Sequence, residues 1–268
     1  YGGLFAGWPG LPVPVIVRAH GSASSNAYQL NKPLNPLIHF LEKWTYGRAY
    51  AWISVSNYAA QIVKQSLGLS RGPDAVIYNS VQISREWKPI LERGSNTVIF
   101  LGNLSVHKGA LSLIKAWPTV VANYPKAVLH IYGKDSNTSN GLSMREMMQN
   151  TLPISIRDFV IFHGFVEREI LQEVLRSTAR VVVLPSFAEA FSLAPLESMA
   201  AGCPTIYTKM ASGPELITDG VDGLLVDPSD PVGIAQAILL LLTDDQLAER
   251  ISMAGCERAC KFDLKNIV

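Results

Sequence analysis

Two glutamates, Glu189 and Glu197, stand eight residues apart in the segment SFAEAFSLAPLESMAAGCP, residues 186–204. Carboxylates accept hydrogen bonds from hydroxyl groups, so this pair suits hydroxyl-rich partners such as a ribose and a hexose. The apolar run 181–184 predicts a buried parallel strand, and residues 193–201 predict a helix that ends before Gly202 and Pro204. Both carboxylates are therefore expected along a cleft at the carboxyl end of a strand, where ligands bind in open α/β sheets.

The segment FLGNLSVHKG, residues 100–109, carries a second kind of chemistry. It predicts a strand that ends at Gly102, a short loop, and Lys108 at the start of the next helix. The glycine lets backbone approach a ligand closely, the helix N-terminus adds partial positive charge, and the Lys108 ammonium can stabilise charge on a departing diphosphate. A glycine, a loop and a lysine taken alone would favour a surface lysine, but the position at the opening of a doubly wound domain favours phosphate binding.

A third group of polar residues follows the run VIV at 15–17. His20 comes at the end of this strand, and either a ligand contact or a structural role fits a lone histidine there. Arg18 fits a phosphate or acceptor contact and a scaffold ion pair equally well. Two further strand exits, at Gly133 and at Gly164 followed by Phe165, add backbone contacts on the same side.

Alternating strands and helices must position these residues. In the first part we expect strands at 13–17, 51–55 and 75–78 and helices at 34–46 and 58–67. In the second part we expect strands at 97–101, 127–132, 160–163, 180–184, 205–207 and 223–226, and helices at 109–123, 143–151, 167–177, 193–201, 231–242 and 245–260. Such alternation predicts an α/β fold with parallel sheets wound on both faces. Residues 81–96 lack a sustained period and predict the connection between domains 1–90 and 91–268.

Composition sets wider limits. The chain has 268 residues, 48% of them hydrophobic and 17% charged, which predicts a globular protein. Its net charge of +1 is uninformative by itself, and we expect no nucleic-acid partner. Residues 1–95 carry nine Lys/Arg against four Asp/Glu, which fits a basic face for phosphate or anionic lipid as well as an ordinary solvated surface. No apolar run approaches the roughly 20 residues of a membrane span. Three cysteines, Cys203, Cys256 and Cys260, fit a reducing cytosol, and we expect small buried residues rather than a metal site.

The pattern E-x7-E followed by A-x-G-x-P resembles the signature of retaining GT-B glycosyltransferases of family 4. Further segments appear in the family's order, namely RAHG at 18–21, NSV at 79–81, GNL at 102–104 and GVDGLLV at 220–226. The resemblance implies two Rossmann-like domains. It makes residues 1–90 the later part of an acceptor-side domain and residues 91–268 the nucleotide-sugar domain.

The resemblance also implies a reaction, in which a glycosyl group moves from a nucleotide sugar to a saccharide or lipid-linked acceptor with retention of configuration. The family needs no metal and no cofactor, and its hexosyltransferases often serve polysaccharide biosynthesis in the cytoplasm or at the inner face of a membrane. By the resemblance the first glutamate contacts donor-sugar hydroxyls and the second contacts the ribose. The implied catalytic residues are His20, Glu189 and Lys108. The implied donor-binding residues are Gly102, Asn103, Lys108, Gly133, Phe165, Glu189, Phe191, Ser192, Leu193 and Glu197.

The chain departs from the family pattern in two respects. Asn103 stands where members usually carry an arginine that grips the diphosphate together with the lysine. The chain also starts without methionine and stops before the family's last helices, so we expect a fragment that binds nucleotide with little turnover by itself. A catalytically silent nucleotide-binding module and a nucleotide-sugar epimerase are the alternatives. A nicotinamide-dependent dehydrogenase would need G-x-G-x-x-G after a first strand, and the sequence lacks that motif.

Overall fold

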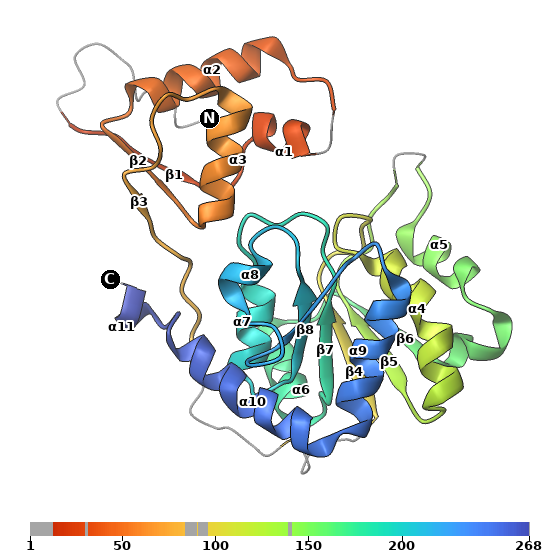
Figure 1. Ribbon diagram of the computed structural model, residues 1–268. Coiled ribbons are helices and arrows are strands. Elements are labelled where there is room, and N and C mark those ends of the chain that lie inside the picture. The colour runs from red at the N-terminus through yellow and green to blue at the C-terminus, as the bar shows by residue number, and fades with distance from the viewer. Residues whose placement is uncertain (1–12, 30–31, 84–89, 91–95, 139–140, 268) are drawn as a thin grey trace. The chain divides into compact units, whose positions relative to one another are not determined.

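The computed structural model describes residues 13–29, 32–83, 90, 96–138 and 141–267 (Figure 1). Its contacts divide the chain into two compact units. The first unit comprises residues 1–79 together with 189–191 and 267. The second comprises residues 80–188, 192–266 and 268.

The first unit holds a three-stranded parallel sheet in the order β1-β2-β3. Its strands and helices are β1 (Ile16–Ala19), α1 (Ala23–Gln29), α2 (Pro36–Arg48), β2 (Ala51–Ser54), α3 (Asn57–Leu67) and β3 (Ala75–Val76). Helix α3 begins where the Ser56 hydroxyl accepts from the backbone N–H of Ala59 and ends at Gly68, which adopts the left-handed conformation. The core gathers around Trp52 and Leu67, both fully buried.

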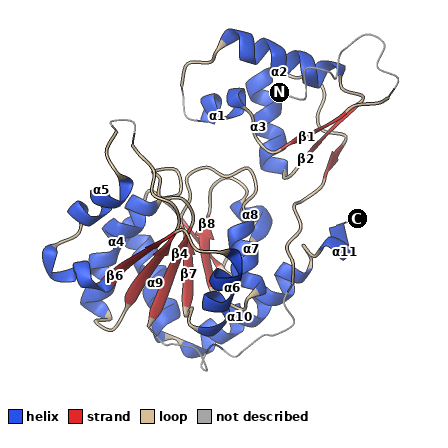
Figure 2. Cartoon of the chain, turned by 180° about the vertical axis from the view of Figure 1, so that it is seen from behind, coloured by secondary structure: helices blue, strands red, loops and turns tan. Residues whose placement is uncertain are grey.

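The second unit is built on a six-stranded parallel sheet in the order β6-β5-β4-β7-β8-β9 (Figure 2). Its strands are β4 (Thr97–Leu101), β5 (Val128–Tyr132), β6 (Val160–Gly164), β7 (Val181–Leu184), β8 (Thr205–Thr208) and β9 (Leu224–Val226). All residues of β7 and β8 are buried, because helices cover both faces of the sheet. This explains why β7, with the sequence VVVL, is an apolar run rather than an alternation, whereas β8, with the sequence TIYT, buries two threonines as well.

The remaining helices lie between or after these strands along the chain. They are α4 (Ala110–Asn123), α5 (Met144–Thr151), the 3-10 helix η3 (Ile154–Phe159), α6 (Arg168–Ser177), α7 (Leu193–Ala200), α8 (Gly213–Leu216), α9 (Pro231–Thr243), α10 (Asp245–Cys260) and α11 (Leu264–Ile267). Helix α4 packs against α9 and α5, and α10 packs against α7 and α9. The main hydrophobic core includes Phe100, Trp117 and Ile131.

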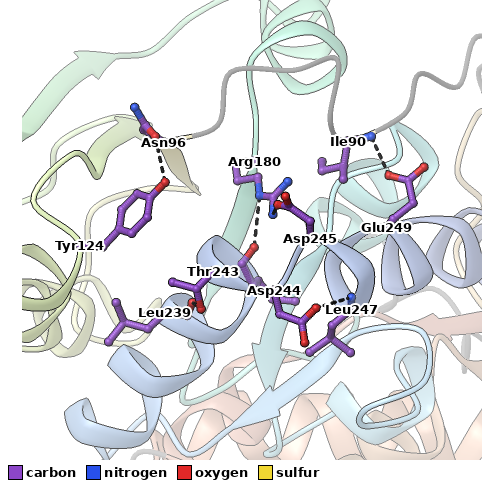
Figure 3. Close-up of polar contacts among 11 residues, drawn as sticks. Ile90, Asn96, Tyr124, Arg180, Leu239, Thr243, Asp244, Asp245, Leu247 and Glu249 are labelled. Carbon is purple, nitrogen blue, oxygen red and sulfur yellow. Dashed lines mark hydrogen bonds and ion pairs between the residues drawn. The ribbon is translucent and has the colours of Figure 1, made fainter.

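The edge of the second unit opposite the strand exits is fixed by polar contacts (Figure 3). Arg180, only 2% exposed, donates to the Leu241 carbonyl and to the Asp245 carboxylate at 2.6 Å. The backbone N–H of Ile90, a fully buried residue, donates to Glu249 at 2.8 Å. The connecting segment is therefore anchored to α10 at this point.

The predicted α/β architecture with parallel sheets is confirmed, and most boundaries agree to within two residues. The first strand was predicted at 13–17 and lies at Ile16–Ala19, so that prediction is wrong by two to three residues. Helix α1 was not predicted, because its Ser- and Asn-rich sequence lacks apolar periodicity. The first turn of α1 is fixed by Glu42 of α2, whose carboxylate accepts hydrogen bonds from the backbone N–H groups of Ala23 and Ser24. Of the predicted connection at 81–96, residues 84–89 and 91–95 lie outside the described residues.

The cysteines follow the expectation only in part. Cys203 is buried, with its thiol donating to the Leu175 carbonyl, but Cys256 is half-buried and Cys260 is exposed. Cys260 is the last residue of α10 and is exposed, although its neighbour Ala259 is buried. Within the described ranges, histidine, cysteine, aspartate and glutamate side chains do not gather in any group of three that could hold a metal ion. Among those same residues, none of the helices combines the length and apolar character that crossing a bilayer requires.

Candidate functional site

The exits of β4 and β5 lie side by side. The two strands pair in register from Thr97 with Val128 to Leu101 with Tyr132, so Gly102 and Gly133 follow at the same level. A Cβ atom on Gly133 would stand 1.9 Å from the Gly102 carbonyl oxygen. Only glycine permits this approach, and both residues have positive φ angles, +136° and +154°. The two half-buried glycines therefore bring the backbones of the two exits into direct contact.

The neighbouring exit of β6 joins the same row. The backbone N–H of Gly133 donates to the Gly164 carbonyl at 2.8 Å, and the N–H of Leu104 donates to the Lys134 carbonyl at 2.9 Å. Gly164 has a φ of +72° and turns the chain toward Phe165. The structure thus brings together Gly102, Gly133 and Phe165 at the carboxyl edge of one sheet.

Lys108 lies at the same edge of the sheet, in the loop that precedes α4. A Cβ atom on Gly102 would lie 3.8 Å from Lys108 Cδ, so the lysine stem passes over the glycine. The loop between them is fixed from the other side as well, because the N–H of Phe187, after β7, donates to the His107 carbonyl at 2.7 Å. Asn103 and His107 are exposed, and Lys108 is half-buried. A cationic side chain beside bare glycine backbone at a strand exit suits a phosphate or diphosphate.

Gly109 has a role that the sequence pattern did not reveal. It was predicted as the first residue of the helix, but it has a φ of +72° and caps α4 from outside. A Cβ atom here would lie 1.9 Å from the Pro185 carbonyl oxygen. Gly109 therefore lets the Lys108 loop pack directly on the exit of β7.

An aromatic platform stands at the exit of β6. The Phe165 ring is 62% exposed, and Lys134 Nζ lies 4.9 Å from its centroid, within the range of a cation–π interaction. Lys134 was missed in the sequence because no motif singled it out. An exposed ring at a strand exit offers a face on which a planar base can stack.

Two histidines pair across β5 and β6. His130 Nδ1 and His163 Nε2 are 2.9 Å apart, and the His163 ring stacks on Tyr132 with centroids 4.3 Å apart. Desolvation lowers the pKa of both imidazoles below the ordinary 6.5, and for His130 the proximity of His163 lowers it further. Their pairing across β5 and β6 depends on strand register, so neighbouring sequence gave no signal for it.

The histidine pair predicts a stability that depends on pH. A pKa that is lowered by folding means that the folded protein disfavours the protonated imidazole. The neutral histidines therefore contribute their full stability above pH 6.5, and this contribution is lost as the pH falls through their lowered pKa values in the folded protein. We expect the free energy of unfolding in urea to fall from about pH 7.5 to about pH 5.5. The fall should be smaller in His163→Gln. An equal fall in the variant would assign the effect to other groups, of which His20, with a pKa also lowered, is the first to replace.

Glu197 lies in the second turn of α7 and is not alone. Its carboxylate Oε1 accepts from Arg168 Nη2 at 2.8 Å, and the glutamate side chain is 23% exposed. It also lines a pocket of about 170 Å³ with Gln82, Ile83, Gln172, Arg176, Ala200 and Ala201. Ser192 precedes α7, and Leu193, its first residue, is 37% exposed. Arg168 was missed because the sequence does not show that the first residue of α6 reaches the second turn of α7.

Glu189 and Phe191 belong to the segment that groups with the first unit. The Phe191 ring stacks on Tyr78 with centroids 5.5 Å apart. In the same unit His20 is exposed after β1, and its pKa is lowered by partial burial and by the charge of Arg18. Arg18 donates to Asn79 and to the Ile77 carbonyl, which is the scaffold role. Glu189, Phe191 and His20 therefore do not fall in the unit that holds Lys108 and Glu197, and their place in one site stays a prediction.

Comparison with known proteins places this geometry in a family. The sequence model of Glycosyl transferases group 1 matches residues 83–258, and that of Glycosyltransferase Family 4 matches residues 1–85. The chain belongs to the glycosyl transferases group 1 family. The resemblance inferred from the paired glutamates is thereby confirmed.

Relatives in this family are distant and longer. The uncharacterized glycosyltransferase MJ1607 of Methanocaldococcus jannaschii is 26% identical over 87% of this chain and 61% of its own length. A glycogen synthase of Mycobacterium tuberculosis is 25% identical over 95% of this chain and 61% of its own length. The chain thus spans about three fifths of these curated relatives.

Solved structures agree on the fold. Sucrose-phosphate synthase from Thermosynechococcus elongatus superposes with a TM-score of 0.76 at 24% identity, covering 94% of this chain and 64% of that one. Anabaena Alr3699/HepE in complex with UDP and glucose superposes with a TM-score of 0.75 at 20% identity, covering 95% and 69%. The two parallel sheets and these likenesses show the GT-B fold, as predicted.

Proposed function

We propose that the chain is the donor-binding part of a retaining glycosyltransferase. Such an enzyme moves a hexosyl group from a nucleoside diphosphate sugar to a saccharide or lipid-linked acceptor, without a metal ion. One observation carries the proposal: three glycine-lined strand exits meet at one sheet edge with the Lys108 stem laid over Gly102. Membership of the family supports it.

Each group at this edge has a proposed partner in the donor. Lys108 and the backbone at Gly102, Asn103 and Gly133 hold the diphosphate. Phe165 stacks on the base, and Glu197 accepts hydrogen bonds from the ribose. Residues of the other segments complete the donor site, with Glu189 and His20 at the hexose and Phe191, Ser192 and Leu193 beside the diphosphate.

Retention of configuration is part of this proposal. The glycosidic bond to the diphosphate breaks as the acceptor oxygen attacks from the same face of the sugar. The leaving phosphate takes the acceptor proton, and Lys108 together with backbone N–H dipoles stabilises the negative charge that grows on the diphosphate. Glu189 acts through hydrogen bonds to the sugar and forms no covalent bond to it.

A second candidate function is nucleotide binding without catalysis. Asn103 favours it, because an amide beside the phosphates brings hydrogen bonds but no charge. The epimerase alternative is weaker, because the family match covers residues 83–258 as a glycosyltransferase.

Calorimetric titration of the protein with UDP, GDP and ADP, with and without EDTA, tests the proposal. UDP comes first because HepE was crystallised with UDP and with UDP-glucose. Saturable binding of one diphosphate that survives EDTA is the expected result. A folded protein that binds none of the three would overturn the donor site. Binding without turnover of the matching nucleotide sugar in a longer protein would favour the silent module.

The role of Lys108 can be separated from that of the base. Lys108→Met should weaken nucleoside diphosphate binding by about 1.5 kcal/mol, the lower end for a hydrogen bond to a charged group, since the lysine is half-buried. Binding of the nucleoside without phosphates should not change. Lys115→Met, which replaces an exposed lysine of α4, is the matched control. Equal effects of the two replacements would remove Lys108 from the phosphate site.

Asn103 offers a gain rather than a loss. Asn103→Arg adds a guanidinium on the exposed loop beside Gly102, and we expect nucleoside diphosphate to bind about fivefold more tightly at low salt. The nucleoside should bind as before. The same titrations measure both. If the gain appears equally with the nucleoside, Asn103 does not face the phosphates.

A further inference from the structure

We infer that Arg168 is a positioning residue for the ribose, which acts by holding the Glu197 carboxylate in place. This inference rests on the proposed function, because it assumes that Glu197 meets a nucleotide. It adds a residue that the family signature does not contain and that sequence spacing did not suggest.

The contact itself has the geometry of a strong ion pair. Arg168 Nη2 donates to Glu197 Oε1 at 2.8 Å, which is the usual length of a charge-assisted hydrogen bond. The arginine side chain is 56% exposed and the glutamate 23%. An ion pair with this degree of exposure contributes little to the stability of the fold. We therefore look for a role of the pair in ligand binding.

The positions of Arg168 and Glu197 in the chain indicate such a role. Arg168 is the first residue of α6, and it follows Phe165 at the exit of β6 by three residues. Glu197 is the fifth residue of α7. In a nucleotide the ribose joins the base to the phosphates. A ribose whose base stacks on Phe165 therefore lies near the start of α6, within reach of the carboxylate that Arg168 holds.

The carboxylate keeps acceptor capacity for a diol. A carboxylate has two oxygens and about four lone-pair sites. Within the described residues, Arg168 is the only side chain that hydrogen-bonds to Glu197, through Oε1. Oε2 and the second lone pair of Oε1 can accept from the 2′- and 3′-hydroxyls. Holding a flexible glutamate in advance removes part of the entropy cost of ordering it when the ligand binds.

The test compares ligands that differ only in the ribose hydroxyls. Calorimetry would measure UDP and 2′,3′-dideoxyuridine diphosphate against the unmodified protein, Arg168→Met and Arg168→Lys. We expect Arg168→Met to weaken UDP about fivefold, the upper end for an ion pair of this exposure, and to leave the dideoxy analogue unchanged. Arg168→Lys should restore part of the affinity. In a Glu197→Gln background, Arg168→Met should have no further effect.

Arg176→Met is the matched control, because it removes the same charge from the same helix near the same pocket. Arg176 pairs with Glu173 at 3.3 Å instead of with Glu197. A general loss of attraction for an anion would weaken both ligands in both arginine variants. That result, or tighter UDP binding by Arg168→Met, would overturn the role of Arg168.

The two proposals fail differently. If the unmodified protein binds none of UDP, GDP and ADP, both the proposed donor site and the role of Arg168 are overturned. If GDP or ADP is the diphosphate that binds, its own dideoxy analogue takes the place of the uridine pair. Binding with an equal loss for both ribose and dideoxy ligands overturns Arg168 alone.

Discussion

Gly109→Ala should lower the free energy of unfolding of the second unit by about 4 kcal/mol. Two costs add. An alanine at a φ of +72° is strained, and its Cβ would stand 1.9 Å from the Pro185 carbonyl oxygen, so the backbone must move. The Lys108 loop should move with it, which should weaken nucleoside diphosphate binding as well. Urea unfolding followed by circular dichroism measures the first effect.

Gly220 provides a close control for this replacement. Its φ is +71°, almost the same, but a Cβ atom there would meet no other atom within 4 Å. Gly220→Ala should therefore cost only the conformational strain, about 1 kcal/mol. The difference between the two variants isolates the approach of Gly109 to the β7 exit. Equal losses in both would mean that the loop accommodates a methyl group and that this approach is not required.

Glu197→Ala should weaken nucleoside diphosphate binding by about 2 kcal/mol, or about thirtyfold, because the ribose hydroxyls lose a charged acceptor. The fold should be kept, since the side chain lies between helices α6 and α7 and its partner Arg168 is mostly exposed. The nucleoside without phosphates should lose about as much affinity as the diphosphate does, because both carry the ribose.

Two variants sharpen this experiment. Glu197→Gln keeps the shape and one acceptor oxygen, so it should fall between alanine and the native residue. Glu173→Ala removes a glutamate that pairs with Arg176 on α6 and should leave binding unchanged. Unchanged affinity in a folded Glu197→Ala protein would contradict the assignment of Glu197 to the ribose.

Most strands and helices of this fold could be predicted from the sequence, because buried parallel strands are short apolar runs and the helices between them have clear end signals. The runs 97–101 and 181–184 illustrate this, since each became a strand with one residue of error at most. Helix α1 could not be predicted. Its first turn depends on a contact with Glu42, nineteen residues later, and local helix propensity does not indicate such a contact.

The candidate site divides in the same way. Glycines 102 and 133 and Lys108 could be chosen from sequence, since each follows an apolar run or opens a helix. Lys134 and Arg168 could not be chosen, because their partners Phe165 and Glu197 lie on other elements of the sheet edge. Sequence also placed Gly109 inside a helix, where only the nearby Pro185 carbonyl explains why a glycine with positive φ is needed.

The sequence by itself determined the α/β class, the order of most strands and helices, and a family pattern centred on Glu189 and Glu197. These depend on local periodicity and on residue spacing, which a chain carries with it in any conformation. Only the tertiary structure decided that Lys108 lies over Gly102, that Gly133 abuts the Gly102 carbonyl, and that Arg168 holds Glu197. Those contacts arise from the parallel register of β4, β5 and β6 and from the meeting of the first residue of α6 with the fifth residue of α7. Neither can be inferred from residues that are neighbours in the sequence.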